Sequence, residues 1–247
     1  MRYAQMGYRV VLITCTDGQL GLDDAGRPGS DCEHDDDATR ARRASELQRA
    51  AILAGFERVV TLGYDDSGMR GWSQNDSRRA FMNANVEAVA HTLAAMLDEL
   101  EATVVLTYDE NGFYGHPDHI MANVVTRRAL GLATRPERLY YPVVPEAILA
   151  RFVTGAVAQG VALPQWVLEA GRGIEDALVT TSLNVRPFAE RKRAAIAAHA
   201  SQRDNADLVS MDDELFSLLF GTEYYQRAWS RRPAAHDADD LFGGLHE

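Results

Sequence analysis

The segment from Tyr114 to His119 gathers side chains that could bind a metal ion and transfer protons. It reads Tyr-Gly-His-Pro-Asp-His and places two histidines three positions apart. Residues three apart on a helix share one side, so His116 and His119 could face the same site. Neutral imidazole is a common zinc ligand, and a catalytic zinc takes three protein ligands and a water. Asp118 could reach one of the rings and fix its tautomer. The segment therefore predicts a metal-dependent site.

The same residues are also compatible with a purely structural role. An aspartate in the first turn of a helix complements the helix dipole, and two surface histidines need no further function. Pairs of histidines at this spacing are common and do not by themselves specify a metal site. The spacing alone leaves both interpretations open.

The surrounding elements would place this segment at one edge of a parallel sheet. Apolar runs predict strands, and stripes of apolar residues predict helices. The predicted order is strand 8–15, helix from about Thr39 to Gly55, strand 59–62, helix 86–100, strand 103–107 and a helix from Pro117. This alternation is typical of an α/β fold: a Rossmann-like, mostly parallel sheet with helices on both faces and ligands at the carboxyl edge. The two longer apolar runs predict strands that are buried on both faces.

The rest of the chain shows weaker patterns. A short helix over residues 1–6 should end at Gly7. Later elements are expected as a helix over 145–157, a strand over 177–185, a helix over 187–200 and a short helix over 215–220. We predict a single domain over residues 1–230, followed by a polar tail over 231–247 that contains Asp237, Asp239 and Asp240.

The composition narrows the class of partner. The 247 residues carry a formal net charge of −11, with 36 acidic and 25 basic residues. This balance argues against a nucleic-acid or anionic-membrane binder, because both require a basic surface. No signal peptide and no apolar run of about 20 residues is present, so we expect a cytoplasmic protein with no membrane span. A small-molecule substrate is compatible with this net charge, and the sequence leaves open whether the protein forms a homo-oligomer.

Several other reactive residues favour structural interpretations. Cys15 and Cys32 cannot form a disulfide framework and do not share the spacing of a metal site. His34 precedes three aspartates, but this acidic run follows a polar loop and leads into a helix N-terminus, where carboxylates are favourable. His199 lies on an alanine-rich helix, where a packed histidine is expected rather than a catalytic one.

Residues 109–119 resemble the distal motif of the LmbE-like (PIG-L) N-deacetylases, a family that includes the actinobacterial enzymes acting on N-acetylglucosaminyl inositol in mycothiol synthesis. Several further segments resemble motifs of this family in the same order: Thr14–Gly21, Arg43–Leu47, Asp66–Met69 and Arg191–Gln202. Phe113 departs from the family pattern, which usually has glycine there, and could narrow the mouth of the pocket beside Tyr114.

The resemblance implies a role for each matching residue. His119 would be a zinc ligand. His116 would stabilise the oxyanion and protonate the departing amine, with Asp118 tuning it and Tyr114 as a mobile second donor. Arg43 and Asp66 would bind sugar hydroxyls, although by residue type alone they could equally be a solvated helix residue and part of an ordinary turn.

The resemblance also implies a first strand and a His-Pro-Asp-Asp loop ahead of residue 1, which would supply two zinc ligands and the general base. Three hypotheses follow. The protein is a zinc-dependent N-deacetylase of an amino-sugar conjugate whose sequence here begins at an internal methionine. Alternatively, the chain is a metal-free, inactive relative that binds sugar through Arg43 and Asp66. The third is an amidase of thiol conjugates. Under the first hypothesis, an extended chain should be more soluble, because the strand over residues 8–15 would gain a sheet neighbour.

Overall fold

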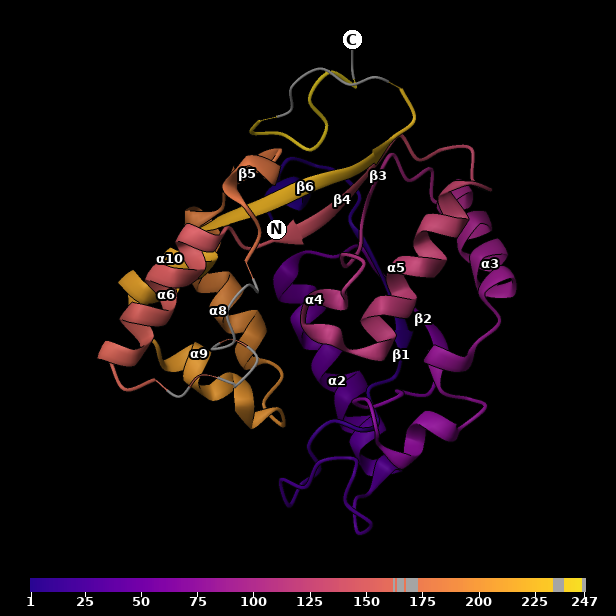
Figure 1. Ribbon diagram of the computed structural model, residues 1–247, viewed down its shortest axis with the longest axis vertical. Coiled ribbons are helices and arrows are strands. Elements are labelled where there is room, and N and C mark those ends of the chain that lie inside the picture. The colour runs from indigo at the N-terminus through magenta and orange to yellow at the C-terminus, as the bar shows by residue number, and fades with distance from the viewer. Residues whose placement is uncertain (162, 164–166, 168–172, 233–237, 246–247) are drawn as a thin grey trace. The chain divides into compact units, whose positions relative to one another are not determined.

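The computed structural model describes residues 1–161, 163, 167, 173–232 and 238–245 (Figure 1). Backbone contacts divide the chain into two compact units. The first comprises residues 1–84 and 185–220, and the second comprises residues 85–184 and 221–247. The single domain over residues 1–230 therefore stays a prediction.

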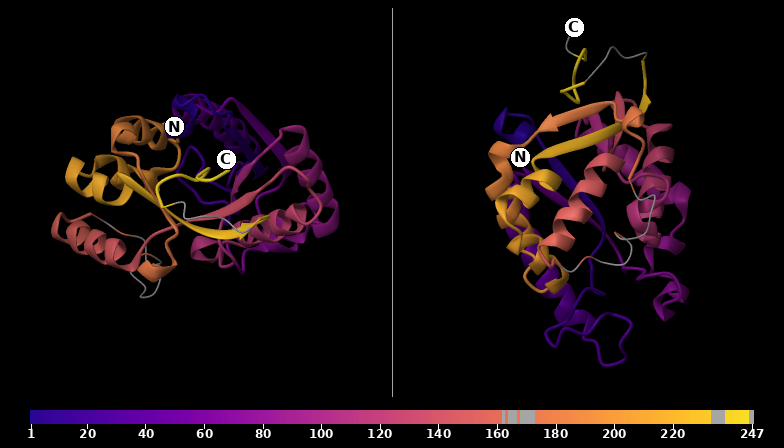
Figure 2. Two further views of the ribbon diagram at one scale, coloured as in Figure 1. Left: turned by 90° about the horizontal axis from the view of Figure 1, so that it is seen from above. Right: turned by 60° about the vertical axis from the view of Figure 1, so that its left-hand side comes forward.

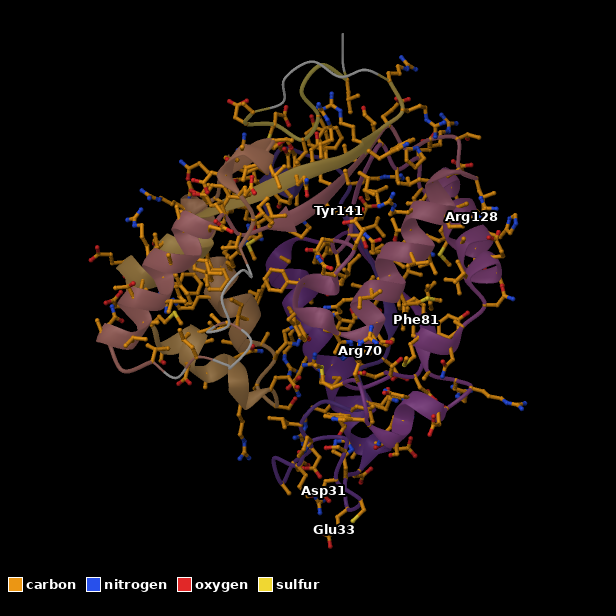
Figure 3. All side chains as sticks on the ribbon, in the orientation of Figure 1. Asp31, Glu33, Arg70, Phe81, Arg128 and Tyr141 are labelled. Carbon is orange, nitrogen blue, oxygen red and sulfur yellow. The ribbon has the colours of Figure 1, made fainter. Side chains whose placement is uncertain are left out.

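The first unit is built around a pair of parallel strands. Its helices and strands are α1 (Arg2–Gln5), β1 (Val11–Thr16), α2 (Asp36–Ala54), β2 (Arg58–Tyr64), α8 (Ala189–Ala197), α9 (Ala206–Ser210) and α10 (Asp213–Phe220), with short 3-10 turns at Ser73–Asp76, Phe81–Asn83, Arg186–Phe188 and Arg203–Asn205. In the register of the pair, Val11 lies opposite Arg58 and Ile13 opposite Val60. The loop between β1 and α2 is long, and its exposed residues Asp31 and Glu33 are labelled in Figure 3.

Helix α2 has a complete set of end signals. The Asp35 side chain accepts a hydrogen bond from the backbone N–H of Ala38 and caps the N-terminus. Gly55 ends the helix in the left-handed conformation, with φ of 80°. The predicted start near Thr39 was about one turn late, because the acidic run that we expected to lead into the helix forms its cap and first turn.

The second unit contains a four-stranded mixed sheet. Its elements are α3 (Val86–Glu99), β3 (Val104–Leu106), α4 (Gly112–Gly115), α5 (Pro117–Leu130), β4 (Arg138–Val143), α6 (Glu146–Ala158), a 3-10 turn at Asp176–Leu178, β5 (Thr181–Asn184) and β6 (Thr222–Ser230). The strand order is β3-β4-β6-β5. Strands β3 and β4 are parallel, whereas β6 is antiparallel to both β4 and β5. Figures 1 and 2 show β6 as the long strand of this sheet.

The core of this unit lies between the sheet and the helix pair α3 and α5. The predicted stripe on α3 supplies Val89, Leu93 and Leu97, each less than 9% exposed. Strand β4 buries Leu139, Tyr140 and Tyr141 at 2% exposure or less. On the outer surface of the helix pair, Arg128 of α5 bonds Glu87 of α3 at 2.7 Å. The C-terminal end of α5 is therefore fixed to a well-packed scaffold.

The α/β fold predicted from the sequence is confirmed, and three local predictions need correction. The strand expected over 177–185 is shorter, because residues 176–178 form a 3-10 turn and pairing with β6 begins at Thr181. Strand β6 (Thr222–Ser230) was missed, because no element was predicted between the helix over 215–220 and the tail over 231–247. The runs at 8–15 and 103–107 form strands, but β1 is half-buried throughout and Leu106 of β3 is 50% exposed. Within the described residues each pairs with one neighbouring strand.

The predicted tail lies only partly within the described residues, since 233–237 and 246–247, including Asp237, fall outside them. The described part is held by the second unit. The carbonyl of Ala238 accepts a hydrogen bond from Ser182 N at 2.8 Å, and the Leu241 side chain is 2% exposed. Among the described helices, none combines the length and the apolar character needed to cross a bilayer.

Candidate active site

His116 begins helix α5 as its N-cap, and Pro117 follows at the first helical position, as the sequence predicts. The ring Nδ1 of His116 accepts a hydrogen bond from the backbone N–H of Asp118 at 3.2 Å. An accepting Nδ1 carries no proton, so the proton of the neutral ring lies on Nε2. The helix cap therefore sets the tautomer of His116.

His119 is held in the opposite tautomer. Its Nδ1 lies 3.1 Å from the carbonyl oxygen of Gly112, and a carbonyl can only accept, so Nδ1 is the donor. The lone pair of the neutral ring is then on Nε2. Burial, followed by the nearby charge of His116, lowers the pKa of His119 from 6.5 to about 4. The ring is consequently neutral at pH 7, which is the form that binds metal ions.

Tyr108 forms the wall behind His119. The two rings stack at 3.8 Å between centroids and 5° between planes. The carbonyl of Tyr108 accepts a hydrogen bond of 2.7 Å from Asn123, which is 2% exposed on α5. Tyr108 was not predicted as a site residue from the sequence. Its place directly after β3, at the carboxyl end of a parallel strand, was the available signal.

A tight turn carries Tyr114 to the histidines. The Asp109 carboxylate accepts hydrogen bonds from the backbone N–H groups of Asn111 and Phe113, at 3.1 and 2.9 Å. Phe113 adopts φ of 65° and ψ of −59°, a conformation that disfavours residues with a side chain. This geometry gives a physical reason for glycine at the position. The ring centroid of Tyr114 lies 6.0 Å from that of His116 and 5.0 Å from that of His119.

The residues at the start of α5 have the chemistry of part of a metal-binding set. The ring centroids of His116 and His119 are 4.9 Å apart, so the two histidines share one side as predicted. Asp118 is 6% exposed, and one of its carboxylate oxygens lies within 4.8 Å of a ring nitrogen of His116. Imidazole and carboxylate groups are both ligands that divalent metal ions accept, and of the two rings His119 offers its Nε2 lone pair, whereas Nε2 of His116 carries the proton.

Arg43 and Asp66 belong to the first unit. The Arg43 guanidinium on α2 contacts Glu46 and His199, at 2.9 and 3.1 Å from its Nη1. Asp66 lies on the loop after β2, where its Oδ1 accepts the backbone N–H of Gly68 at 2.8 Å. The buried amide of Gln19 bonds the backbone of Asp66 in both directions, at 2.8 and 3.4 Å. Both predicted substrate residues are thus held in defined positions within their own unit.

His34 occupies a buried position in the same unit, with a side chain that is 1% exposed. Its Nδ1 lies 2.8 Å from a carboxylate oxygen of Asp36, and its Nε2 lies 2.7 Å from the carbonyl oxygen of Gly21. Both ring nitrogens face protein oxygens. This arrangement fits the structural role that the sequence favours for His34.

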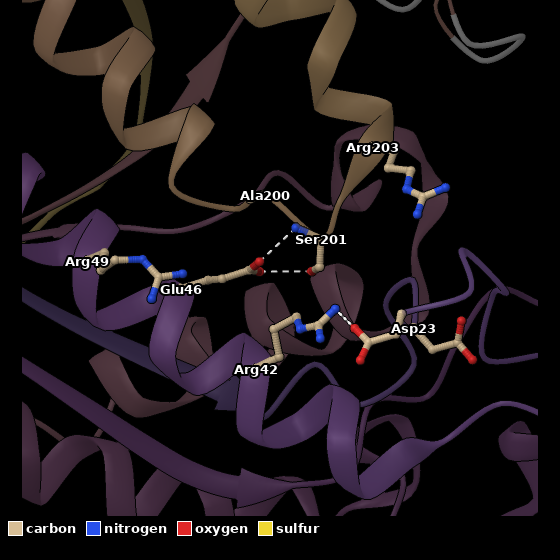
Figure 4. A pocket seen from close by; sticks show the side chains of 8 residues that line it. Asp23, Arg42, Glu46, Arg49, Ala200, Ser201 and Arg203 are labelled. Atoms are coloured by element: carbon tan, nitrogen blue, oxygen red, sulfur yellow. Dashed lines mark hydrogen bonds and ion pairs between the residues drawn. The ribbon is translucent and has the colours of Figure 1, made fainter.

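The first unit also contains a cavity of about 280 Å³ beside α2 (Figure 4). Three arginines and three carboxylates line it, together with two small residues: Arg42, Arg49, Arg203, Asp23, Asp24, Glu46, Ala200 and Ser201. The formal charges in its wall balance, so the cavity has no net charge with which to select an ion.

Comparison with known proteins shows where the chain belongs. The family model described as PIG-L, GlcNAc-PI de-N-acetylase, matches residues 1–130. A 1D-myo-inositol 2-acetamido-2-deoxy-α-D-glucopyranoside deacetylase of Geodermatophilus obscurus is 36% identical, covering 99% of this chain and 90% of the relative. The enzyme of the same name from Streptomyces scabiei is 34% identical, covering 99% of this chain and 83% of the relative.

Solved structures support the same fold. The N,N'-diacetylchitobiose deacetylase of Pyrococcus horikoshii matches with a TM-score of 0.57 and 17% identity, over 92% of this chain and 75% of that one. The 4-carboxy-2-hydroxymuconate hydratase of Pseudomonas putida matches with a TM-score of 0.56 and 16% identity, over 95% and 90% of the two chains. At such identities the likeness shows the fold alone. The family model and the near full-length relatives show more, and by them this chain belongs to the PIG-L family of de-N-acetylases.

Proposed function

We propose that this protein is a zinc-dependent hydrolase that removes the acetyl group from an N-acetylglucosaminyl conjugate of the inositol type. The observation that carries the proposal is the convergence of Tyr114, His116 and His119 at the start of α5, with ring centroids 4.9 to 6.0 Å apart. The substrate class is supported by the names of the relatives that match the chain over almost its full length.

His119 would hold the metal through Nε2, because Gly112 occupies its Nδ1. A bound zinc would supply Lewis-acid chemistry, making water more acidic and polarising the amide carbonyl. Affinity for zinc rises with the number of correctly placed ligands, so other residues must complete the set. The stack on Tyr108 fixes the plane of the His119 ring and so the direction of its lone pair.

His116 would supply the proton chemistry. Its Nε2–H can donate a hydrogen bond to the amide oxygen as negative charge develops there. To protonate the departing amine the ring would enter the step as imidazolium, with Nδ1 protonated in place of the hydrogen bond from Asp118, and would return to the neutral form when the Nε2 proton leaves. The Asp118 carboxylate lies beside the ring and would help to orient it. The Tyr114 hydroxyl would be a second donor to the same oxygen.

Arg43 and Asp66 would recognise the sugar. A guanidinium offers only donors and a carboxylate only acceptors, so together they complement hydroxyl groups, which can do both. Asp66 is already oriented by the N–H of Gly68, which limits the ordering that binding would require.

The test measures acetate release from 1D-myo-inositol 2-acetamido-2-deoxy-α-D-glucopyranoside. Two forms are used: the chain as printed, and the same chain with whatever in-frame codons precede it in the gene. Activity should disappear after chelation and return with zinc. His119→Ala should lose both zinc binding and activity, while His116→Ala should lose activity and keep zinc. Exposed His91 on α3 supplies the control variant His91→Ala, which should match the wild type.

The two other hypotheses give different results in the same experiment. An inactive sugar-binding relative would bind the substrate in calorimetry without releasing acetate in either form. An amidase of thiol conjugates would cleave those conjugates and leave the N-acetyl sugar intact. Acetate release that is indifferent to chelation would contradict the zinc dependence.

A further inference from the structure

Glu46 is a buried carboxylate that takes no part in the proposed metal, proton or sugar contacts. Its side chain is 2% exposed on α2, three residues after Arg43. Its oxygens accept hydrogen bonds from the backbone N–H of Ser201 at 2.7 Å and from the Ser201 hydroxyl at 2.9 Å (Figure 4), and from Nη1 of Arg43 at 2.9 Å. A buried carboxylate is costly unless it is paired and hydrogen-bonded, so these three donors are what retain the charge.

The charge state of Glu46 follows from these contacts. Burial by itself would raise the pKa of the carboxyl group, but the two Ser201 donors and the Arg43 guanidinium together lower it below its ordinary value. Glu46 is therefore ionised at neutral pH and exerts a full electrostatic attraction on Arg43.

The Arg43 guanidinium is held from two sides. Its Nη1 lies 2.9 Å from Glu46 and 3.1 Å from Nδ1 of His199. Because a guanidinium can only donate, Nδ1 of His199 must accept, and the ring proton is then on Nε2. The side chain of Arg43 nevertheless remains 24% exposed, so it is fixed in direction without being closed off from a ligand.

The same carboxylate holds the segment that follows α8. The Ser201 hydroxyl accepts a hydrogen bond of 2.7 Å from the amide of Gln202, whose oxygen lies 3.4 Å from the backbone N–H of Leu22. A Cβ at Gly21 would lie only 2.9 Å from the Gln202 amide, so a larger residue there would displace the end of the Gln202 side chain. Glu46 thus connects α2, residues 199–202 and the loop after β1.

We propose that Glu46 is a positioning residue: with the segment 199–202, which it holds in place, it fixes the Arg43 guanidinium in the orientation in which Arg43 contacts the sugar hydroxyls of the substrate. This inference rests on the proposed function, in which Arg43 is a substrate contact. Glu46 does not touch the reacting atoms. Its effect should consequently appear in substrate binding rather than in the chemical step.

The first experiment observes Arg43 without using a substrate. Nitrogen-15 NMR of the imidazole rings, assigned by comparison with His199→Gln, should show His199 in the Nε2-protonated tautomer in the wild type. Glu46→Gln removes the charge that holds Arg43, so the His199 signals should shift toward a mixture of tautomers. Glu57→Gln, at an exposed position of the same unit, should change nothing. Unchanged His199 signals in Glu46→Gln would overturn the proposal.

The second experiment measures kinetics on the N-acetyl sugar. Glu46→Gln should raise KM about tenfold and leave kcat within about threefold. The substitution weakens the charged hydrogen bond that holds Arg43, and Arg43 contributes to substrate binding rather than to the chemical step. Ser201→Ala removes one hydrogen bond but keeps the charge pair, and its KM should stay within about twofold of the wild type. An equal rise in KM for both variants would mean that Glu46 only stabilises the fold, which overturns the proposal.

The two failures are distinguishable. A wild-type chain that releases no acetate in either form overturns the proposed function and the substrate part of this inference. The NMR experiment then still decides whether Glu46 holds Arg43 in place.

Discussion

The two histidines of the candidate site present different nitrogens to their surroundings. His116 uses Nδ1 as an acceptor for the N–H of Asp118, whereas His119 uses Nδ1 as a donor to the carbonyl of Gly112. One ring therefore keeps a proton on Nε2 and the other a lone pair. This difference supports His116 as the proton donor and His119 as the metal ligand, since identical side chains are given opposite chemistry by backbone groups alone.

A single carboxylate should give the first unit a measurable pH dependence. Burial would raise the pKa of Asp23, but hydrogen bonds from the backbone and the side chain of Arg27, with its charge, lower it to about 2. A lowered pKa contributes stability above the unfolded value of about 3.9, and this contribution is lost as the pH falls toward about 2. The Tm difference between the wild type and Asp23→Asn should thus be constant above about pH 5 and shrink between about pH 4 and 2.

Thermal melts at a series of pH values check this. Asp76→Asn, at an exposed position of the same unit, is the control and should show no such shrinking difference. A Tm difference for Asp23→Asn that grows on acidification would contradict the expected sign.

At the scale of the element, the turn at residues 109–115 combines a proposed site residue, Tyr114, with backbone strain. Phe113 has φ of 65° although it is not glycine, and its side chain is 37% exposed. The Asp109 carboxylate compensates by accepting two backbone N–H groups of the turn. The turn is held in this form because it delivers Tyr114 to the histidines, which is where strained backbone is commonly found.

Two substitutions at Phe113 should reveal the strain. In an ordinary exposed segment glycine is less stable than alanine by about 0.5 to 1 kcal/mol. At Phe113 the order should be reversed, with Phe113→Gly more stable than Phe113→Ala by about 1 kcal/mol, because only glycine adopts positive φ without cost. Urea denaturation of the two variants measures this difference. If Phe113→Ala is instead more stable than Phe113→Gly, the turn is unstrained.

At the scale of the whole molecule, the fold is shared by proteins with different chemistry. The solved structures that resemble this chain include a deacetylase and a hydratase at similar TM-scores. A fold hosts many functions, so the proposed reaction rests on site residues and on relatives at 34 to 36% identity rather than on architecture.

The C-terminal residues are attached to the second unit through a buried cation. Arg138 on β4 is 1% exposed, and its guanidinium donates to the carbonyl oxygens of Leu241 and Gly243 and to the hydroxyl of Tyr140. Arg138→Met should lower the free energy of unfolding by about 2 to 4 kcal/mol, since it leaves buried acceptors without their donor. It should also speed proteolysis near the C-terminus.

Chemical denaturation and limited proteolysis measure the two effects. The control is Arg232→Met, because the Arg232 side chain is 81% exposed and its loss should cost less than about 0.5 kcal/mol. An Arg138→Met variant as stable as this control would mean that the C-terminal residues contribute nothing to the unit.

The sequence by itself determined the features that depend on neighbouring residues. Caps and periodicity are local, so two features were predicted correctly: His116 as the N-cap of α5, followed by Pro117 at the first helical position, and the apolar stripe of α3. The family resemblance followed from ordered motifs, and the α/β fold from the alternation of predicted strands and helices. The tertiary structure decided what depends on distant residues: Glu46 meets Ser201 across 155 positions, and the buried Arg138 meets Leu241 across 103. Strand β6, which pairs with the distant strands β4 and β5, belongs to the same class. Such contacts form only when packing brings remote segments together, and no local pattern encodes their partners.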